Sequence, residues 1–396
     1  MKFSIGKFSI VKFSIGLAAG LVVLLMSVTG VLLAYEKQIV RWADGYHGAP
    51  TTAGQPRLPI EQIVEKARTA HASGTPASVT VRNAIDAPVE VNFGRDGSVF
   101  LHAYTGEVLG TGNPSTRAFF RSTMEWHRWL ALKDASRATG KMVTGVSNLV
   151  FLFIVLSGFY LWWPRTWTWT QFRQVLWFRG GLAGKARDFN WHHVIGYWSL
   201  VPLAVIVWSG VVIGYSWASD LTFRMVGETP PQQAGPPRPG EGGPPRPEGA
   251  RAGDDAPAEA PRGLALGALI ARAEAHTADW TIISARLPRP SDPMVQVSID
   301  TGTGAQPQKR GTLTLDRATG ATKKWEGFEA QSPGRQWRLW MRFVHTGEYY
   351  GLIGQTIAMI VSAGAVVLVW TGLALTWRRF TAWRRRSPRQ SASAAA

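Results

Sequence analysis

The 396-residue sequence contains no cysteine. This excludes structural disulfides, iron–sulfur clusters, thiolate-ligated haem and covalently attached c-type haem. Any redox centre must therefore be held by histidine or by other non-thiol ligands. The sequence also lacks a Gly-X-Gly-X-X-Gly fingerprint after a predicted strand, so we expect neither a nicotinamide nor a flavin site.

Acidic residues are scarce, with 26 Asp and Glu against 43 Lys and Arg, a formal net charge of +17. Most of the excess lies in the N-terminal tip, residues 164–190 and residues 378–396, whereas the long segments 36–140 and 216–350 are nearly balanced. The positive-inside rule therefore predicts that the three basic segments are cytoplasmic. No basic patch lies outside these membrane flanks, so we expect no nucleic-acid binding.

Four apolar runs are long enough to cross about 30 Å of hydrocarbon. They are residues 13–35, 143–163, 192–217 and 352–377. The first run has no small-residue cleavage site before Glu36, so we expect a retained anchor and not a cleaved signal peptide. Four spans place both termini on one side, which the charge pattern predicts to be the cytoplasm.

Short motifs recur at nearly constant spacing, as in an internal repeat. Thr105-Gly106 and Thr319-Gly320 are 214 residues apart, Ser157-Gly158 and Thr371-Gly372 are 214 apart, His127 and His345 are 218 apart, and Thr29-Gly30 and Ser209-Gly210 are 180 apart. The second copy is longer because of residues 229–262, a Pro- and Gly-rich segment predicted to be a flexible linker. The sequence thus predicts a mainly α membrane protein with four transmembrane helices arranged as an internal repeat.

Each repeat also contains a predicted small α+β module outside the membrane, over residues 50–115 and 263–330. In each, a segment with helical spacing precedes segments with the alternating pattern of strands. The predicted helices are residues 58–71 and 264–276; the predicted strands are 78–81, 89–93, 99–103, 282–287, 294–299 and 311–316. Neither module contains a nucleophile–base pair or a phosphate-binding loop. Their predicted role is to bind a partner or to cover a membrane site.

Two histidines, His127 and His345, border apolar runs at equivalent places in the repeat. A pseudo-two-fold axis would bring them face to face, as two axial ligands of one haem iron require. Nearby arginines could pair with haem propionates and tryptophans could wall the ring: Arg121, Arg128, Arg338, Arg342, Trp126, Trp129, Trp337 and Trp340. The alternative is that these residues anchor the helices at headgroup level.

His192 and His193 open the third apolar run on the predicted cytoplasmic side. Adjacent helical residues point about 100° apart, so we expect one to be a ligand and the other to face the interface. A helix from His192 to Gly214 rises roughly 33 Å at about 1.5 Å per residue, which places this site on the leaflet opposite His127 and His345. The other four histidines lie in polar stretches and are expected to have no ligand role: His47, His71, His102 and His276.

Four motifs together resemble the PepSY-associated transmembrane proteins, which include bacterial inner-membrane ferric-siderophore reductases. They are His127-Arg128-Trp129-Leu130, His192-X-X-X-Gly196, His345-Thr346-Gly347 and the Ser/Thr-Gly pairs. The resemblance implies two PepSY-like periplasmic modules, one or two non-covalent, histidine-ligated haem b groups, and reduction of a ferric siderophore with release of Fe(II) in the periplasm. It also implies an inner-membrane location in contact with lipid, a quinol or cytoplasmic electron donor, and periplasmic siderophore-handling partners.

One motif departs from this family. Such proteins often begin the first helix with His-Arg-X-X-Gly, whereas this chain has Lys12-Phe13-Ser14-Ile15-Gly16. The histidine that would complete an inner haem opposite His192 is therefore missing from that position. Either another residue is the ligand, such as His193 through a distorted helix start, or the inner site is altered. Two other functions stay open: a non-enzymatic accessory protein of metal uptake, and a metal transporter that binds iron or copper in passage.

Overall fold

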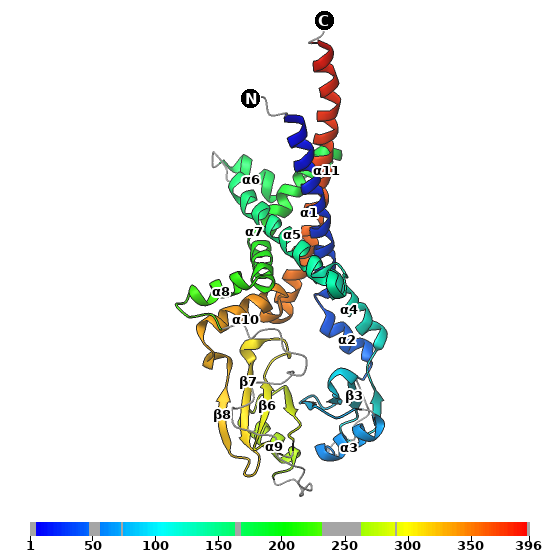
Figure 1. Ribbon diagram of the computed structural model, residues 1–396, viewed down its shortest axis with the longest axis vertical. Helices are drawn as coiled ribbons and strands as arrows, with labels where there is room; N and C mark the ends of the chain where they lie inside the picture. The colour runs from blue at the N-terminus through cyan, green and yellow to red at the C-terminus, as the bar shows by residue number, and fades with distance from the viewer. Residues whose placement is uncertain are drawn as a thin grey trace.

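A computed structural model describes residues 5–46, 56–72, 74–162, 168–231, 263–289 and 291–393. It consists of a helical bundle joined to a β-sheet, with both termini at the end of the bundle far from the sheet (Figure 1). We call these two ends of the bundle the sheet end and the terminal end. The predicted linker, residues 229–262, lies almost wholly outside the described residues.

Four long helices form the bundle: α1 (Ile5–Leu33), α5 (Arg137–Trp162), α7 (Gly184–Gly214) and α11 (Gly351–Ser393). Each provides all or most of a stretch long and apolar enough to cross a membrane; among the described residues these stretches are Gly16–Leu33, Asp134–Tyr160, Gly184–Gly214 and Glu348–Trp383. Each of the four apolar runs found in the sequence overlaps one of these helices, so a mainly helical chain with four candidate spans is confirmed.

The long helices pack around a shared apolar core. α11 lies against both α7 and α1, and α5 lies against the same two helices. The core side chains come from three of the four helices: Leu152, Val155, Leu203, Val207, Val211, Val361, Ala365 and Leu368. Glycine allows close approach, since a Cβ at Gly364 would lie 3.1 Å from Ser199 Oγ. Large side chains such as Phe153 and Ile353 face outward, as expected of helices surrounded by lipid.

The part of the molecule next to the helical bundle is one eight-stranded antiparallel sheet with strand order β4-β3-β2-β1-β5-β6-β7-β8. The strands are β1 (Ser78–Arg82), β2 (Val89–Asn92), β3 (Ser98–Leu101), β4 (Val108–Gly110), β5 (Ile282–Arg286), β6 (Met294–Asp300), β7 (Arg310–Asp316) and β8 (Thr322–Glu326). Each predicted α+β segment supplies four neighbouring strands, and the two sets join where β1 pairs with β5. Thr80 Oγ1 and Ser284 Oγ share a hydrogen bond of 2.8 Å across this central pair.

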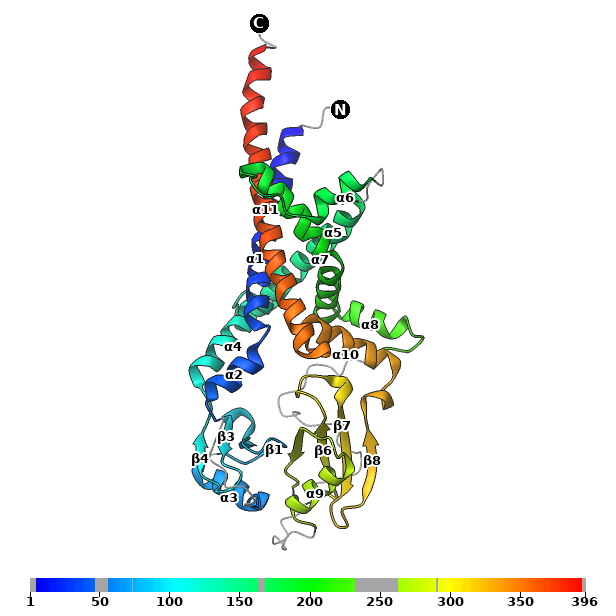
Figure 2. The same ribbon diagram turned by 180° about the vertical axis from the view of Figure 1, so that it is seen from behind.

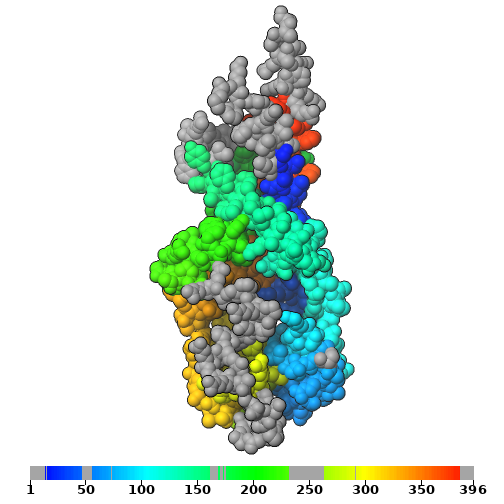
Figure 3. Space-filling model, viewed as in Figure 1, coloured from blue at the N-terminus to red at the C-terminus, as the bar shows by residue number. Residues whose placement is uncertain are grey.

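The sheet has a single hydrophobic core beneath two helices, α3 (Ile60–Ala70) and α9 (Leu266–His276). Alternate residues of the strands face this core, as Val79 and Val81 do in β1 and Val295, Val297 and Ile299 do in β6. The first-half and second-half segments lie side by side in the space-filling view (Figure 3). The two α+β segments therefore share one core and are not separate units.

Shorter helices connect the sheet to the bundle: α2 (Glu36–Asp44), α4 (Pro114–Trp129), α8 (Ser216–Arg224) and α10 (Pro333–His345) (Figure 2). The sequence pattern did not predict them, although two begin with clear capping signals. Asn113 Oδ1 accepts from Thr116 N before α4, and Ser332 Oγ accepts from Arg335 N before α10. Helix α6 (Trp169–Leu176) lies beside α7 at the terminal end.

Candidate functional site

The two histidines predicted to face each other do lie together at the sheet end of the bundle. His127 is in the last turn of α4, and His345 is the last residue of α10. α4 packs against α1, and α10 packs against α7. The centres of the two imidazole rings are 6.3 Å apart and their planes are inclined by 60°.

Hydrogen bonds fix which nitrogen of each ring carries the proton. Thr29 Oγ1 lies 2.7 Å from Leu25 O and 2.9 Å from His127 Nδ1; with the hydroxyl hydrogen on Leu25 O, as usual in a helix, Oγ1 accepts from His127 Nδ1. His345 Nδ1 donates to Ile206 O at 2.9 Å, because a carbonyl oxygen has no hydrogen to give. Both Nδ1 atoms are therefore protonated in the neutral rings, and both Nε2 atoms keep a free electron pair. This is the tautomer that a metal-binding histidine needs.

Two Ser/Thr-Gly pairs form the sockets for these rings. The hydroxyl residue supplies a hydrogen bond. Ser209 Oγ lies 3.1 Å from His345 Nδ1, and Thr29 Oγ1 lies 2.9 Å from His127 Nδ1. The glycine that follows leaves room for the ring, since a Cβ at Gly210 would lie 3.3 Å from His345 Cε1. The sequence patterns predicted a repeat and a family resemblance from these pairs, but not their contact with the histidines. The constant order of the two residues, a hydroxyl residue followed by glycine, was the sequence feature that could have indicated this contact.

Glycines also hold the two histidine-bearing helices against the long helices that follow. A Cβ at Gly140, early in α5, would overlap the backbone oxygen of Trp129 at the end of α4. A Cβ at Gly354, early in α11, would overlap the backbone oxygen of Gly347, just after α10. Contacts this close exclude any larger residue, so the two glycines set the positions of His127 and His345 relative to the bundle.

Burial keeps both imidazoles neutral. Burial is the main cause that lowers the pKa of His127 to about 4, and the neighbouring His345 and Arg128 lower it further. Burial likewise lowers the pKa of His345. Both rings are thus uncharged at neutral pH, which is the form that binds a metal ion.

The spacing of the rings fits two axial ligands on one metal. An imidazole nitrogen binds a metal ion at about 2.0 Å, so two imidazoles on opposite sides of one ion have ring centres roughly 6 Å apart. The observed separation is 6.3 Å. Within the part of the chain that the structure describes, no cluster of three or more His, Cys, Asp or Glu side chains is suited to hold a metal. Two protein ligands are the number that a haem iron needs, because the porphyrin supplies its other four, so the residues present fit this group.

Arginines next to the histidines form a positive region. Burial and the positive charges of Arg137 and Arg342 lower the pKa of Arg128, so both of these arginines lie close enough to Arg128 to repel its charge. Arg128 and Arg137 both lie over the ring of Trp129, at 4.6 and 3.6 Å from its centre. Arg128 and Arg342 were predicted to bind an anion and Arg137 was missed. Three arginines close together suit an anionic group such as a propionate.

Other predicted site residues are exposed or contact other residues. Trp126 is 45% exposed. Trp337 and Trp340 contact each other edge to face, with ring centres 5.4 Å apart and planes inclined by 80°. Arg338 Nε donates to Ser219 Oγ of α8 at 2.7 Å, so its guanidinium is directed to that helix. Arg121 is exposed on α4.

His192 and His193 lie near the terminal end, on α7. His192 Nδ1 lies 2.9 Å from Thr371 Oγ1 of α11, and a Cβ at Gly372 would lie 3.5 Å from its Cε1. This is the same socket as at the sheet end. His193 Nδ1 instead donates to Phe189 O of its own helix at 2.8 Å, and its ring lies 4.0 Å from that of Phe189.

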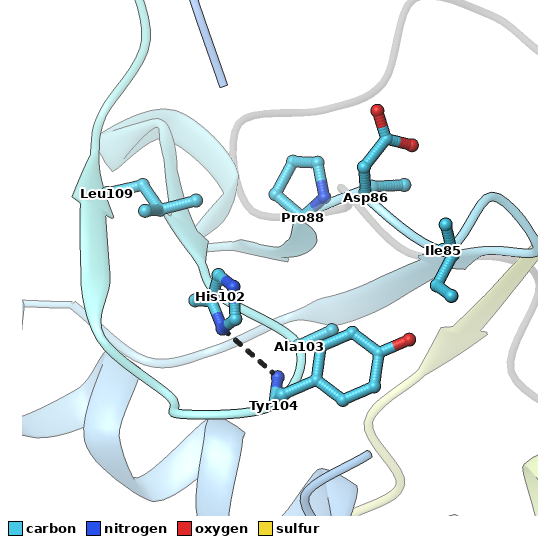
Figure 4. A pocket seen from close by; sticks show the side chains of 8 residues that line it. Ile85, Asp86, Pro88, His102, Ala103, Tyr104 and Leu109 are labelled. Atoms are coloured by element: carbon cyan, nitrogen blue, oxygen red, sulfur yellow. Dashed lines mark hydrogen bonds between the residues drawn. The ribbon is translucent and has the colours of Figure 1, made fainter. Parts of the chain in front are cut away.

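The remaining histidines have structural contacts. His102 Nδ1 accepts from Tyr104 N and Thr105 N at 3.4 and 3.1 Å, beside a small surface hollow (Figure 4). His71 lies against Phe93, and His276 lies against Trp325. His47 falls outside the described residues.

A separate cavity of about 250 Å³ lies between α3 and α9, on the face of the sheet farthest from the bundle. Its lining is mainly apolar, with Arg57 and Glu274 as charged members. No sequence pattern predicted a pocket here. Its position on the far side of the sheet separates it from the histidine pair.

Comparison with known proteins places the chain in a family. The family model described as "PepSY-associated TM region" matches residues 13–379. No curated protein matches the chain. The match covers three candidate spans completely, most of the fourth, and the histidine pair, so this multi-pass membrane protein belongs to the PepSY-associated transmembrane family.

Proposed function

We propose that the protein is a haem-containing reductase of the bacterial inner membrane that passes electrons to a ferric siderophore and releases Fe(II) in the periplasm. The observation that carries this proposal is the pair His127 and His345. Their ring centres are 6.3 Å apart, and both Nδ1 atoms are engaged by hydrogen bonds. Each Nε2 is left free to bind the iron of one haem b.

When bound between two imidazoles, haem supplies one-electron transfer without an open iron position for oxygen. The protein's own contribution is to hold and orient the ligands. Thr29 and Ile206 fix the tautomers, Gly210 gives His345 its place, and burial keeps both rings neutral. Arg128 and Arg342 offer positive charge to the propionates.

The iron chemistry of the proposed reaction balances with one electron for each ferric ion. The electron comes from a quinol in the membrane or from a cytoplasmic reductase, and it converts Fe(III) to Fe(II). Siderophores whose donors are hard oxygen atoms hold Fe(II) more weakly than Fe(III), so release of the ion follows its reduction. The ferric siderophore is the substrate and is recovered as the iron-free chelator.

The proposed orientation follows from charge. Arginine-rich and lysine-rich segments at the terminal end favour the cytoplasm, which puts the sheet in the periplasm. There the sheet is placed to meet the ferric siderophore or periplasmic siderophore-handling proteins. The matched arrangement of α1 with α4 and of α7 with α10 supports the proposed internal repeat.

The test is the visible spectrum of the full-length protein purified in detergent, before and after dithionite. We expect a Soret band that shifts on reduction, and its loss in His127→Ala and in His345→Ala. His276→Ala is the matched control, because this exposed histidine contacts only the sheet. A colourless protein from haem-replete cells would overturn the proposal and favour the accessory or transporter function.

The reaction needs its own measurement. The dithionite-reduced protein, freed of excess reductant, is mixed with a ferric hydroxamate or catecholate and a ferrous-specific dye. We expect dye complex to form at the rate at which the haem is reoxidised. Reoxidation of the haem without formation of Fe(II) would show that the protein binds haem but is not a ferric-chelate reductase.

A further inference from the structure

Four Ser/Thr-Gly pairs occur on the four long helices, one on each. They are Thr29-Gly30 on α1, Ser157-Gly158 on α5, Ser209-Gly210 on α7 and Thr371-Gly372 on α11. Three of them hold an imidazole in the same way, with the hydroxyl 2.9 to 3.1 Å from Nδ1 and the glycine beside Cε1. The three imidazoles are those of His127, His345 and His192.

The fourth pair contacts none of the described histidines. Ser157 Oγ donates to Ile154 O of its own helix at 2.9 Å. Among the described residues, no atom lies within 4 Å of a Cβ built at Gly158. The described histidines all have their contacts elsewhere. The socket on α5 is therefore formed by the backbone and by Ser157 but is not used by a histidine.

The repeat identifies the residue that would fill this socket. α1 belongs to the first copy of the repeat and α7 to the second. Equivalent residues on these two helices are 180 positions apart in the sequence, as Thr29 and Ser209 are. His192 thus corresponds to position 12, which is Lys12 on α1. A lysine at neutral pH carries a protonated ammonium group with no free electron pair, so it cannot replace a neutral imidazole as an iron ligand in that state.

His193 does not supply the missing ligand either. The centres of the His192 and His193 rings are also 6.3 Å apart, but both rings come from one helix. His193 Nδ1 donates to Phe189 O, and its ring packs against the Phe189 ring, so both contacts are with its own helix α7. At the sheet end, by contrast, the two rings come from different helices, α4 and α10, and are hydrogen-bonded to different helices, α1 and α7.

We infer that this chain binds haem only at the sheet end, and that the terminal end carries half a site: His192 lies in a complete socket, and the equivalent socket on α5 is not used by a described histidine. The inference rests on the haem site proposed above. It assigns the vacant ligand position to residue 12, so that a histidine introduced there would complete a second site between α1 and α7.

The test is the number of haem groups per chain in the full-length protein, from haem and protein assays on the same sample. We expect one in the wild type, one in His192→Ala and none in His127→Ala. Lys12→His should raise the number towards two and add a second low-spin signal in electron paramagnetic resonance. Adding His192→Ala to Lys12→His should return the number to one. Lys7→His, on the same helix, is the matched control and should stay at one.

Two haem groups in the wild type, with one lost in His192→Ala, would overturn the inference and leave the proposed function in place. A Lys12→His protein that keeps a single haem would overturn the assignment of position 12. No haem in the wild type would instead overturn the proposed function itself.

Discussion

Thr29 Oγ1 lies 2.9 Å from His127 Nδ1 while it donates its own hydrogen to Leu25 O at 2.7 Å. In this arrangement the Thr29 hydroxyl donates to a carbonyl oxygen of its own helix and accepts a hydrogen bond from His127 Nδ1. The same relation links Ser209, Ile206 O and His345 in the other half of the chain. These contacts determine where the free Nε2 of each ring points, so they should control how tightly the pair binds a metal.

Removing the Thr29 hydroxyl should weaken haem binding. Thr29→Val keeps the shape of the side chain but leaves His127 Nδ1 without its acceptor, and loss of such an orienting partner lowers metal affinity about 10- to 100-fold. Ser209→Ala should have a smaller effect, because His345 keeps Ile206 O at 2.9 Å. Haem titration of the haem-free protein measures both. Ser157→Ala is the control; an equal loss in all three variants would contradict this role.

Gly210→Ala should displace His345. The new Cβ would lie 3.3 Å from His345 Cε1 and 3.1 Å from Asn148 Nδ2, both tighter than ordinary contacts. Gly30→Ala should be milder, since its Cβ would lie 3.8 Å from His127 Cε1. We expect a loss of haem content in Gly210→Ala and nearly full content in Gly30→Ala and in Gly158→Ala. A haem content in Gly210→Ala equal to that in Gly158→Ala would refute the socket.

The joined sheet should unfold as one unit. Ile283 on the central strand β5 is fully buried in the core that both halves share, so Ile283→Ala should lower the free energy of unfolding by about 2 to 5 kcal/mol. Ile85→Ala, at a site 59% exposed, is the matched control. Thermal unfolding followed by tryptophan fluorescence should show one shifted transition for the sheet. Two transitions, only one of them shifted, would mean that the halves unfold separately.

The sequence predicted the long helices well because a membrane span leaves a strong signal: some twenty apolar residues flanked by charge. It located α3, α9 and six of the eight strands by their hydrophobic periodicity. It missed β4 and β8, short or exposed edge strands in which no alternation of buried residues is visible. It also gave no sign that β1 and β5 pair, because pairing across 204 residues depends on how the two halves meet.

The sequence predicted the two histidines of the site but not their hydrogen-bond partners, and the difference has a physical reason. His127 and His345 stood out because histidine is rare at a membrane edge and because the repeat placed them symmetrically. Their hydrogen-bond partners, in contrast, come from positions 98 and 136 residues away. Ser and Thr are common in membrane helices, where they bond to their own backbone, so a hydroxyl alone does not indicate a socket. Only the contact with the imidazole does.

The buried His127 should make the haem-free protein less stable in acid. Its pKa is about 4 in the folded protein against 6.5 for an unperturbed histidine, so protons bind the unfolded chain more readily. The stabilisation is complete above about pH 6.5 and is lost as the pH falls towards about 4, by roughly 3 kcal/mol at most. His127→Gln has no titrating ring, so its unfolding temperature should fall less than that of the wild type between pH 8 and pH 5. His276→Gln should follow the wild type, and identical pH profiles for His127→Gln and the wild type would rule out a contribution from this ring.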